Sequence, residues 1–288
     1  MRGWWQDLTD LVLPAECAGC GRPRAVLCPR CRTALSGAAP RRVRPEPMPP
    51  GLPAVHAAAA YADEVRALLL AHKERGALAL ARPLGEALAG AVRAGLRQGG
   101  HGGASGSRCV SGDGCVLLVP VPSARAAVRA RGHDAARRIA LAAAGELRRG
   151  GTPVRVAAVL RQRRAVADQA GLDSRQRLAN LAGALGVVPG GDRLLARGPV
   201  VLVDDLLTTG ASLTEAARAV RAVADSGVSA VYRRAGGEGR EEHGAAVPEG
   251  RPDRAHLRWG MRDGNRAGRV VCAAVVAASP DSFELNRN

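Results

Sequence analysis

The chain has 288 residues, which suits one substantial domain with small appendages, and 47% of them are hydrophobic, which excludes wholesale disorder. Only 2% are aromatic, so alanine, valine and leucine must fill the core. The formal net charge is +16, and Lys73 is the only lysine among 42 basic residues. Arginine stays ionised and binds phosphate well, so this charge favours partners that carry phosphate, with compositional drift as the alternative explanation.

The sequence contains no segment typical of membrane-spanning or secreted proteins. No apolar run approaches the ~20 residues that a membrane-spanning helix needs. Residues 1–13 lack the basic start, the apolar stretch and the cleavage site of a secretory signal. We therefore expect a cytoplasmic protein without membrane insertion, whose thiols stay reduced.

Short apolar strands that alternate with helical segments predict an α/β fold with a parallel sheet. Residues 1–39 are expected to hold a helix and a cysteine knuckle, residues 40–53 a linker rich in proline and arginine, and residues 54–288 the main domain. Within that domain, residues 98–114 are expected to be a flexible loop and residues 233–269 a polar insertion.

In chain order, the expected elements are a helix over residues 4–13, a strand over 56–61, helices over 64–72 and 78–96, a strand over 115–121, a helix over 135–148, a strand over 154–160, an irregular segment over 161–172, a helix over 174–182, a strand over 200–203, a helix over 210–224 and a strand over 270–278.

Four cysteines near the N-terminus form two CxxC pairs, with seven residues between the pairs. Each pair can turn two thiolates toward one point, and four thiolates complete the tetrahedral shell of a structural Zn²⁺. A redox pair, a disulfide staple and an iron–sulfur cluster are the alternatives, and the spacing in a cytoplasmic chain favours zinc. The expected ligands are Cys17, Cys20, Cys28 and Cys31.

Other residues around the cysteines have simpler interpretations. Gly19 and Gly21 are expected to supply the positive φ angles that such knuckles often need. Cys115 and Cys272 lie in apolar segments without metal-ligand spacing, so we expect both in the hydrophobic core.

The most informative stretch is VLVDDLLTTGASL, over residues 201–213. An apolar strand leads into Asp204 and Asp205, and a threonine-rich turn then leads into a helix. Ligands bind at the carboxyl edge of such a sheet, where the carboxylates can accept hydrogen bonds from a ribose diol. Hydroxyl groups and outward amides at the helix start can bind its 5-phosphate. The candidate phosphate-binding residues are Thr208, Thr209, Gly210, Ala211 and Ser212.

This stretch has two other interpretations. A strand end followed by a capped helix, with no ligand, would explain a single aspartate or threonine but not the whole string. A nucleotide-binding Walker loop is excluded, because the sequence contains neither Gly-Lys-Ser nor Gly-Lys-Thr.

The string resembles the phosphoribosyl-diphosphate signature of type I phosphoribosyltransferases. The chain as a whole resembles the ComF family of competence-related proteins, which pairs an N-terminal cysteine knuckle with such a domain. The resemblance also rests on residues 17–31 and on three further segments. These are YADEVRALLLAHKERG (61–76), LVPVPSARAAVRARGHDAA (118–136) and RRAVADQAGLDSRQRLANLAGAL (163–185).

The resemblance implies a type I phosphoribosyltransferase-like sheet flanked by helices, with Asp204 and Asp205 at the reacting centre. It implies a diphosphate site and a flexible loop that closes over the pocket. Mg²⁺ would bind mainly through diphosphate oxygens and water, so no dedicated metal cluster is expected for it. The implied diphosphate-binding residues are Val121, Pro122, Ser123, Arg125, Arg131 and Lys73. The implied flexible-loop residues are Arg161, Gln169, Arg177 and Asn180.

Two functions of different classes remain open. The first is binding of phosphoribosyl diphosphate or a related phosphosugar. Whether a transfer reaction follows stays open, because no segment resembles an acceptor-binding hood. The second is single-stranded DNA binding in DNA uptake, with no transferase activity. In that case a track of basic side chains would run from the cysteine knuckle to the pocket. Its N-terminal arginines would be Arg22, Arg24, Arg30, Arg32, Arg41, Arg42 and Arg44.

Overall fold

The structure is a computed structural model that describes residues 16–99, 115–166, 173–235 and 269–286. The helix expected over residues 4–13 lies outside the described residues. So do most of the loop expected over residues 98–114 and most of the insertion expected over residues 233–269. Among the described helices, none is long and apolar enough to cross a membrane.

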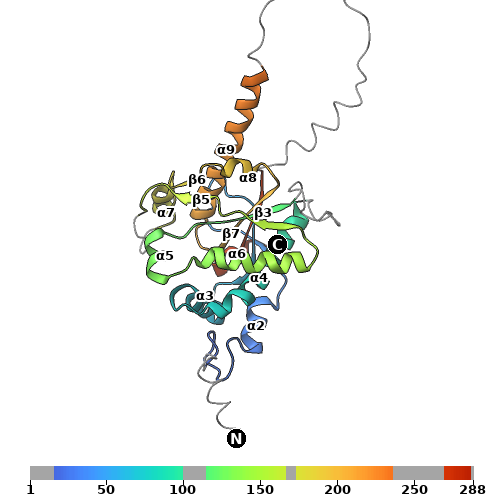
Figure 1. Cartoon of the computed structure of the whole chain (residues 1–288). Coiled ribbons are helices and arrows are strands. Elements are labelled where there is room, and N and C mark those ends of the chain that lie inside the picture. The colour runs from blue at the N-terminus through green and yellow to red at the C-terminus, as the bar shows by residue number, and fades with distance from the viewer. Residues whose placement is uncertain (1–15, 100–114, 167–172, 236–268, 287–288) are drawn as a thin grey trace, which may run out of the picture.

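Six strands form one mostly parallel sheet in the order β1-β2-β8-β7-β3-β4 (Figure 1). Only β1 runs antiparallel to its neighbour, at one edge of the sheet. This sheet confirms the expected α/β class. Its strands are β1 (Arg41–Val43), β2 (Val55–Ala60), β3 (Val116–Pro120), β4 (Val154–Val156), β7 (Val200–Leu207) and β8 (Val270–Ala278). The short strands β5 (Leu160–Gln162) and β6 (Leu185–Val187) form a separate antiparallel pair.

Helices cover both faces of the sheet (Figure 1). One face is packed by α2 (Pro29–Ser36), α3 (Asp63–Glu74), α4 (Ala81–Gln98) and α6 (Ala135–Arg149). The opposite face is packed mainly by α9 (Ala211–Ala235), with α8 (Gly191–Leu195) beside it. The remaining helical elements are α5 (Arg125–Arg131), α7 (Ser174–Leu181) and the 3₁₀ turns η1 (Leu78–Leu80) and η2 (Pro280–Asn286).

The strand side chains divide between two hydrophobic cores. On β7, Val201 and Val203 pack with α4 and α6, whereas Val200 and Leu202 pack with α9. All four side chains are fully buried, as a parallel strand covered on both faces requires. Small residues let the layers approach closely. A Cβ on Gly95 of α4 would lie only 2.7 Å from the Cys272 sulfur on β8.

The order of the strands creates a topological switch point. The chain leaves β3 through α6 and enters β4 on one side of β3, then returns to β7 on the other side. The helix after β7 is α9, which covers the face opposite to α6. The helices therefore depart in opposite directions from the carboxyl ends of β3 and β7, which is where a crevice opens in folds of this type.

Four boundaries differ clearly from the sequence-based expectations. Helix α9 does not end near residue 224 but continues to Ala235, into the start of the expected insertion. The strand expected over residues 154–160 is interrupted, because the Val159 amide donates to the Ala157 carbonyl in a tight turn and separates β4 from β5. Strand β7 continues to Leu207, since its ladder with β8 extends to the pair Leu207 and Ala278. Residues 41–43, expected in the linker, form β1 and bury Val43 by pairing with β2.

Candidate functional site

A cavity of about 400 Å³ lies at the switch point between β3 and β7. A smaller hollow shares four of its lining residues and is formed by the loop after β7 and the start of α9. Segments far apart in the sequence meet at this cavity, because the carboxyl ends of neighbouring parallel strands lie at the same edge of the sheet. The cavity is lined by Lys73, Val121, Pro122, Ser123, Ala124, Arg131, Gln162, Val166, Leu181, Leu185, Asp204, Asp205, Leu206, Thr208 and Ser212.

An ion pair crosses the floor of this cavity. The Lys73 Nζ atom lies 2.8 Å from Asp205 Oδ2, and Asp205 is only 5% exposed. The Asp205 amide donates to Asp204 Oδ1 over 2.8 Å. Both carboxylates lie within β7 rather than after it, so the sheet itself holds them in place.

The two carboxylates are in different electrostatic states. Burial raises the pKa of Asp204 well above its ordinary value, and the negative charge of Asp205 raises it further. Burial also raises the pKa of Asp205, but Lys73 outweighs that effect through its charge and hydrogen bond, so the net pKa is lowered. Desolvation lowers the pKa of Lys73, yet the charges of Asp205 and Asp204 raise it above its ordinary value. These shifts favour an ionised Asp205 beside the Lys73 ammonium. Of the two carboxyl groups, Asp204 holds a proton more readily.

The loop after β7 has the geometry of an anion site. Gly210 has a φ of +77°, in the left-handed region, and its position beside Leu52 and Pro45 leaves little room for a side chain. Helix α9 begins at the next residue, and its first amides have no acceptor within the helix. The smaller hollow is lined by residues 206–213 together with Asp204, so it lies at this helix terminus. All five expected phosphate-binding residues are among its lining.

The loop after β3 forms the opposite wall. Residues 121–123 all line the cavity, and the Val121 amide donates to the Val203 carbonyl over 2.9 Å. Arg131 also lines it, with its guanidinium 3.2 Å from Glu74 Oε1. Arg125 does not line the cavity; it is exposed at the start of α5.

The residues expected in the flexible loop do not gather at the cavity. Arg161 is exposed on β5, while Arg177 and Asn180 lie on α7 outside the lining, and Gln169 falls outside the described residues. Sequence reasoning missed Gln162, which lines the cavity from β5. A strand alternates its side chains between two faces, so an exposed Arg161 would have predicted an inward Gln162 had β5 been recognised.

Sequence reasoning also gave no structural role to two buried histidines, His72 and His133, which contact each other at the end of α3. The His72 and His133 rings are 5.6 Å apart in an edge-on arrangement, and His133 Nε2 lies 3.1 Å from the His72 carbonyl oxygen. Burial lowers the pKa of His72, so its ring is neutral near pH 7. These contacts fix the end of α3 that carries Lys73.

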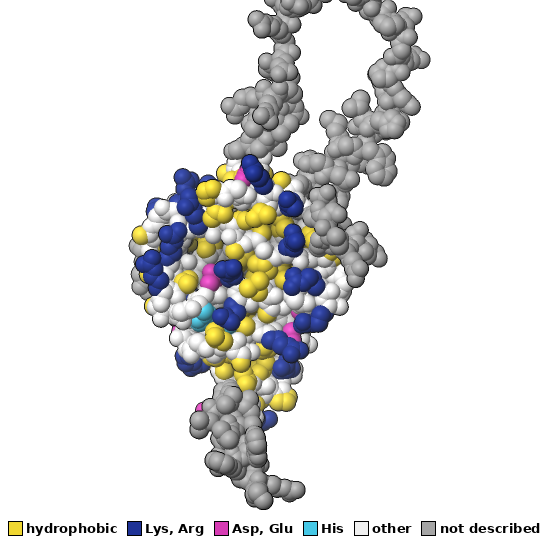
Figure 2. All heavy atoms as spheres, in the orientation of Figure 1, with side chains coloured by type: hydrophobic (Ala, Val, Ile, Leu, Met, Phe, Trp, Pro, Cys, Tyr) yellow, Lys and Arg dark blue, Asp and Glu magenta, His cyan; other side chains and the backbone are white. Residues whose placement is uncertain are grey.

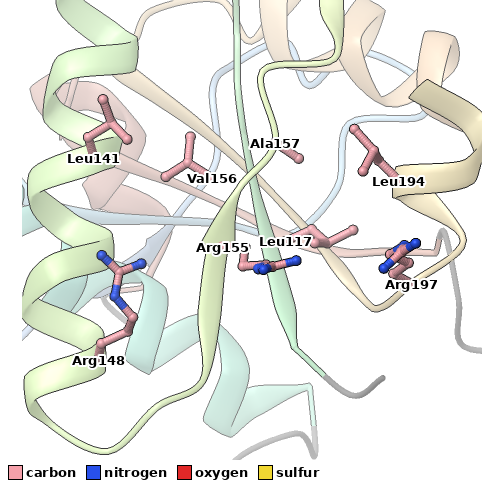
Figure 3. Close-up of a pocket in the computed structure, with 8 residues that line it drawn as sticks. All are labelled: Leu117, Leu141, Arg148, Arg155, Val156, Ala157, Leu194 and Arg197. Atoms are coloured by element: carbon pink, nitrogen blue, oxygen red, sulfur yellow. The ribbon is translucent and has the colours of Figure 1, made fainter. Parts of the chain in front are cut away.

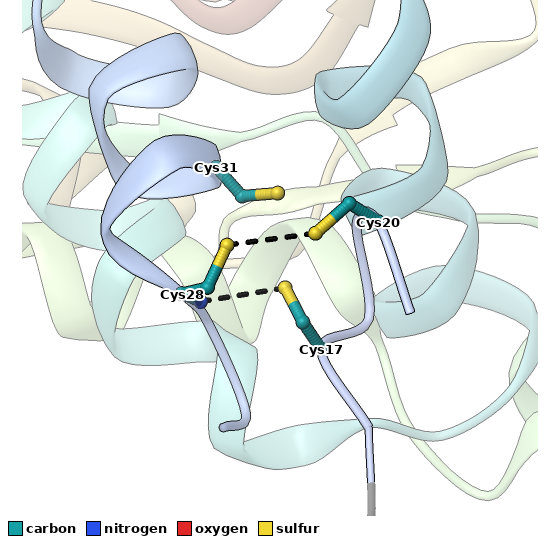
Figure 4. Close-up of side chains that lie close together, drawn as sticks. All are labelled: Cys17, Cys20, Cys28 and Cys31. Carbon is teal, nitrogen blue, oxygen red and sulfur yellow. Dashed lines mark hydrogen bonds between the residues drawn. The ribbon is translucent and has the colours of Figure 1, made fainter. Parts of the chain in front are cut away.

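The four cysteines of the two CxxC pairs converge as expected (Figure 4). Their sulfur atoms all lie within 4.8 Å of one another, and the Cys20 and Cys28 sulfurs are 3.5 Å apart. Sulfurs bound tetrahedrally at ~2.3 Å from a Zn²⁺ would lie about 3.8 Å apart, so the set fits a metal ion. Three of the four are buried, and Cys20 is exposed.

Backbone amides stabilise negative charge within this cluster. The Cys28 amide donates to the Cys17 sulfur over 3.3 Å. Burial raises the pKa of the Cys17 thiol, but amide hydrogen bonds from Cys28, Cys20 and Gly19 outweigh it and lower the pKa to about 6.

The glycines and the remaining cysteines differ in part from expectation. Gly21 has a φ of +74°, as expected. Gly19 does not have a positive φ. A glycine is required there because a Cβ would lie only 2.8 Å from the Cys31 sulfur. Cys115 and Cys272 are both buried. Cys272 is a free thiol, whereas Cys115 is in a disulfide, contrary to the expectation of reduced thiols.

The cysteine cluster is continuous with the main core rather than a separate body. Cys17, Cys28 and Cys31 belong to the same hydrophobic cluster as Val65 and Leu68 of α3. Arg30 pairs with Glu64 of α3, and Arg32 pairs with Glu86 of α4 over 3.1 Å. Helix α3 therefore contacts the cysteines along one side and presents Lys73 to the cavity at its end.

No protein-family model matches the chain, and no curated protein or solved structure is significantly similar to it. The fold and the site by themselves define an α/β protein with a polar cavity at the switch point of a mostly parallel sheet. A four-cysteine cluster suited to a metal ion lies near the N-terminus.

Proposed function

We propose that the cavity binds phosphoribosyl diphosphate or a closely related phosphosugar, in a phosphoribosyltransferase-like protein of the ComF family. One observation carries the proposal. Paired carboxylates, a hydroxyl-rich helix start and a cationic wall meet in one cavity at the switch point. These three chemistries match the diol, the 5-phosphate and the diphosphate of that compound.

The ribose and its 5-phosphate fit the β7 side. Asp204 and Asp205 can accept hydrogen bonds from the two ribose hydroxyls, which a bare phosphate would not offer. The hydroxyls of Thr208, Thr209 and Ser212 can donate to phosphate oxygens, together with the first amides of α9. The positive end of the helix dipole favours the same anion.

The diphosphate fits the wall formed by the β3 loop and α3. Lys73 and Arg131 supply positive charge there, and Ser123 supplies a hydroxyl donor. Mg²⁺ would be held mainly by diphosphate oxygens and water. The only carboxylates among the described lining residues are Asp204 and Asp205, which fits an ion bound through its substrate rather than by the protein alone.

We also propose that the four cysteines hold a structural Zn²⁺. Four sulfur ligands leave no open position for a reacting water, so the ion would stabilise the fold and take no part in chemistry. Through α3 it would also help to position Lys73.

Isothermal titration calorimetry with phosphoribosyl diphosphate and Mg²⁺ tests the main proposal. Saturable binding is expected, and Asp205→Asn should weaken it by about 1–3 kcal/mol, the size of a lost charge-assisted hydrogen bond. Asp192→Asn, which changes an exposed aspartate on α8, is the matched control and should bind like the parent. Absence of binding, or equal affinity of the Asp205→Asn variant, would reject the assignment. Pyrophosphate release with a panel of bases then decides whether a transfer reaction follows.

Single-stranded DNA binding stays a prediction. Two of the arginines expected in the basic track, Arg30 and Arg32, are already paired with glutamates. A salt titration of oligonucleotide binding distinguishes the two functions, since each phosphate contact adds about 0.7 to the slope of log affinity against log salt.

A further inference from the structure

A second cavity, of about 270 Å³, lies at the opposite side of β3 from β7, along the edge strand β4 (Figure 3). One wall is α6, which contributes Leu141 and Arg148. The other wall is α8 and the turn after it, which contribute Leu194 and Arg197. Strand β4 runs between these walls as the floor, so the cavity is a groove along an open sheet edge.

The backbone at this edge has free hydrogen-bonding capacity. The Val116 amide donates to the Pro153 carbonyl, and the Ala157 amide donates to the Leu118 carbonyl. In a parallel ladder this pattern turns residues 153, 155 and 157 toward β3, so Val154 and Val156 face outward. The Arg148 guanidinium donates a hydrogen bond to the Val154 carbonyl oxygen over 3.2 Å. The outward groups of Val156 have no partner among the described residues, and such an edge can pair with another strand.

Each wall of the groove presents an exposed apolar side chain. Leu141 is 52% exposed and Leu194 is 46% exposed, and they are two of the five large hydrophobic side chains exposed in the described part of the chain. In Figure 2, hydrophobic side chains gather on the surface between α6 and α8, with basic side chains around them. An exposed apolar patch with a polar rim is typical of an interaction surface.

The charge at this groove has a single sign. Every charged side chain in its lining is an arginine, namely Arg148, Arg155 and Arg197. All three are exposed, and none has an acidic partner among the described residues. A second copy of the chain would bring arginines against arginines, so electrostatic complementarity requires an acidic occupant. Nucleic acid would satisfy the charge but not the two leucines or the free strand edge.

We propose that this groove binds an extended acidic segment of a partner protein, which adds a strand to β4 and places apolar side chains against Leu141 and Leu194. Successive residues of an added strand point to opposite faces, so neighbouring apolar residues would reach the α6 wall and the α8 wall in turn. Flanking carboxylates would pair with Arg148, Arg155 and Arg197. The inference is independent of the phosphosugar pocket, since it involves none of the residues assigned there.

Fluorescence anisotropy with a labelled peptide, Asp-Glu-Leu-Val-Leu-Glu-Asp, tests the proposal on the full chain. Saturable binding is expected for the parent, and Arg155→Glu and Leu194→Asp should each weaken it at least tenfold. Arg66→Glu, which changes an exposed arginine on α3, is the matched control and should stay within twofold. Loss of affinity equal to that of Arg155→Glu in this control would show diffuse charge attraction and overturn the proposal.

Strand pairing is tested separately by Val156→Pro. Proline at an outward position removes an edge amide without breaking the ladder with β3, so the thermal unfolding midpoint should change little while peptide binding is lost. A peptide methylated at the amides of all three apolar residues, which include the inward amide in either register, and a peptide with lysines in place of the acidic residues should both bind at least tenfold more weakly. Equal binding of either peptide would overturn the proposal. So would displacement of the peptide by a single-stranded oligonucleotide, or a parent dimer that Val156→Pro dissociates.

Discussion

Lys73 and Asp205 form an ion pair across the cavity floor, with 2.8 Å between Nζ and Oδ2, and this contact joins the end of α3 to strand β7. Helix α3 also shares one hydrophobic core with the cysteine cluster, and Glu64 of this helix pairs with Arg30. The only lysine in the sequence thus links the two features that the sequence marks most strongly, the CxxC pairs and the Asp-Asp loop.

The first prediction concerns the stability of this ion pair. Lys73→Met leaves the buried Asp205 without its cation, which for a fully buried pair costs about 3–5 kcal/mol. The Lys73 side chain is 35% exposed, so water screens the pair and the expected loss is about 1–2 kcal/mol. Urea denaturation at pH 7.5 measures it, and Lys73→Arg should recover part of the loss. An unchanged midpoint for Lys73→Met would show that the pair contributes nothing.

The second prediction concerns pH and Asp204. Its pKa is raised in the folded protein, so its contribution to stability is full below the unfolded value of 3.8 and is lost as pH rises through the folded pKa. Asparagine does not titrate, so Asp204→Asn should gain stability relative to the parent as pH rises from 4 to 8.

Asp205 supplies the contrast, since its folded pKa is lowered. Its contribution is present above the unfolded pKa and is lost as pH falls through the folded pKa. Asp205→Asn should therefore lose stability relative to the parent mainly as pH rises from about 2 to 5, and its stability relative to the parent should change little from pH 5 to 8. Urea denaturation at several pH values measures both variants, and parallel pH profiles for the two would contradict the assignment.

The third prediction concerns the metal. Purified protein should contain one zinc per chain by elemental analysis, and Cys17→Ser should lower both the zinc content and the thermal midpoint. Cys272→Ala changes a buried free thiol outside the cluster and should keep the zinc. Because the cluster shares its core with α3 and α4, metal loss should lower the midpoint of the whole described domain in one transition. Less than a fifth of an equivalent of zinc would reject the assignment.

The fourth prediction compares two glycines. Gly210 has a φ of +77°, and a Cβ there would lie 3.1 Å from Leu52, so Gly210→Ala should cost about 1–2 kcal/mol and weaken phosphosugar binding. Gly145 lies inside α6, where a Cβ would meet only the end of the Arg149 side chain in ordinary contact at 3.7 Å, so Gly145→Ala should stabilise the protein by about 0.5–1 kcal/mol. Urea denaturation of both variants gives the comparison, and effects of the same sign would contradict it.

Much of the sheet could be predicted because its strands are continuous apolar runs. The segments expected over residues 115–121, 200–203 and 270–278 became β3, β7 and β8, although the ladder with β8 extends β7 beyond the apolar run to Leu207. The approach of residues 121–123 to residues 204–212 was also predictable. The first segment follows β3 and the second includes the end of β7, and these two strands are parallel neighbours.

The features that sequence reasoning missed depend on tertiary contacts. Strands β5 and β6 have three residues each, too few to show a period, and they exist because they pair with each other across α7. Gln162 enters the cavity only through that pairing. Arg125 was assigned to the diphosphate from the family resemblance, but it is exposed at the start of α5 and does not line the cavity. Strand β1 likewise exists only because β2 offers it an edge.

The cavity at the carboxyl ends of β3 and β7 follows from the path of the backbone, because α6 and α9 depart to opposite faces of the sheet whatever side chains lie between them. Several of its lining residues, among them Ser123, Thr208 and Ser212, belong to connecting loops or a helix start outside both cores. Their replacement alters which compound the cavity binds, while the packing that keeps the chain folded stays in place. During evolution, such a scaffold can change its preferred compound by a handful of substitutions, each nearly neutral for folding.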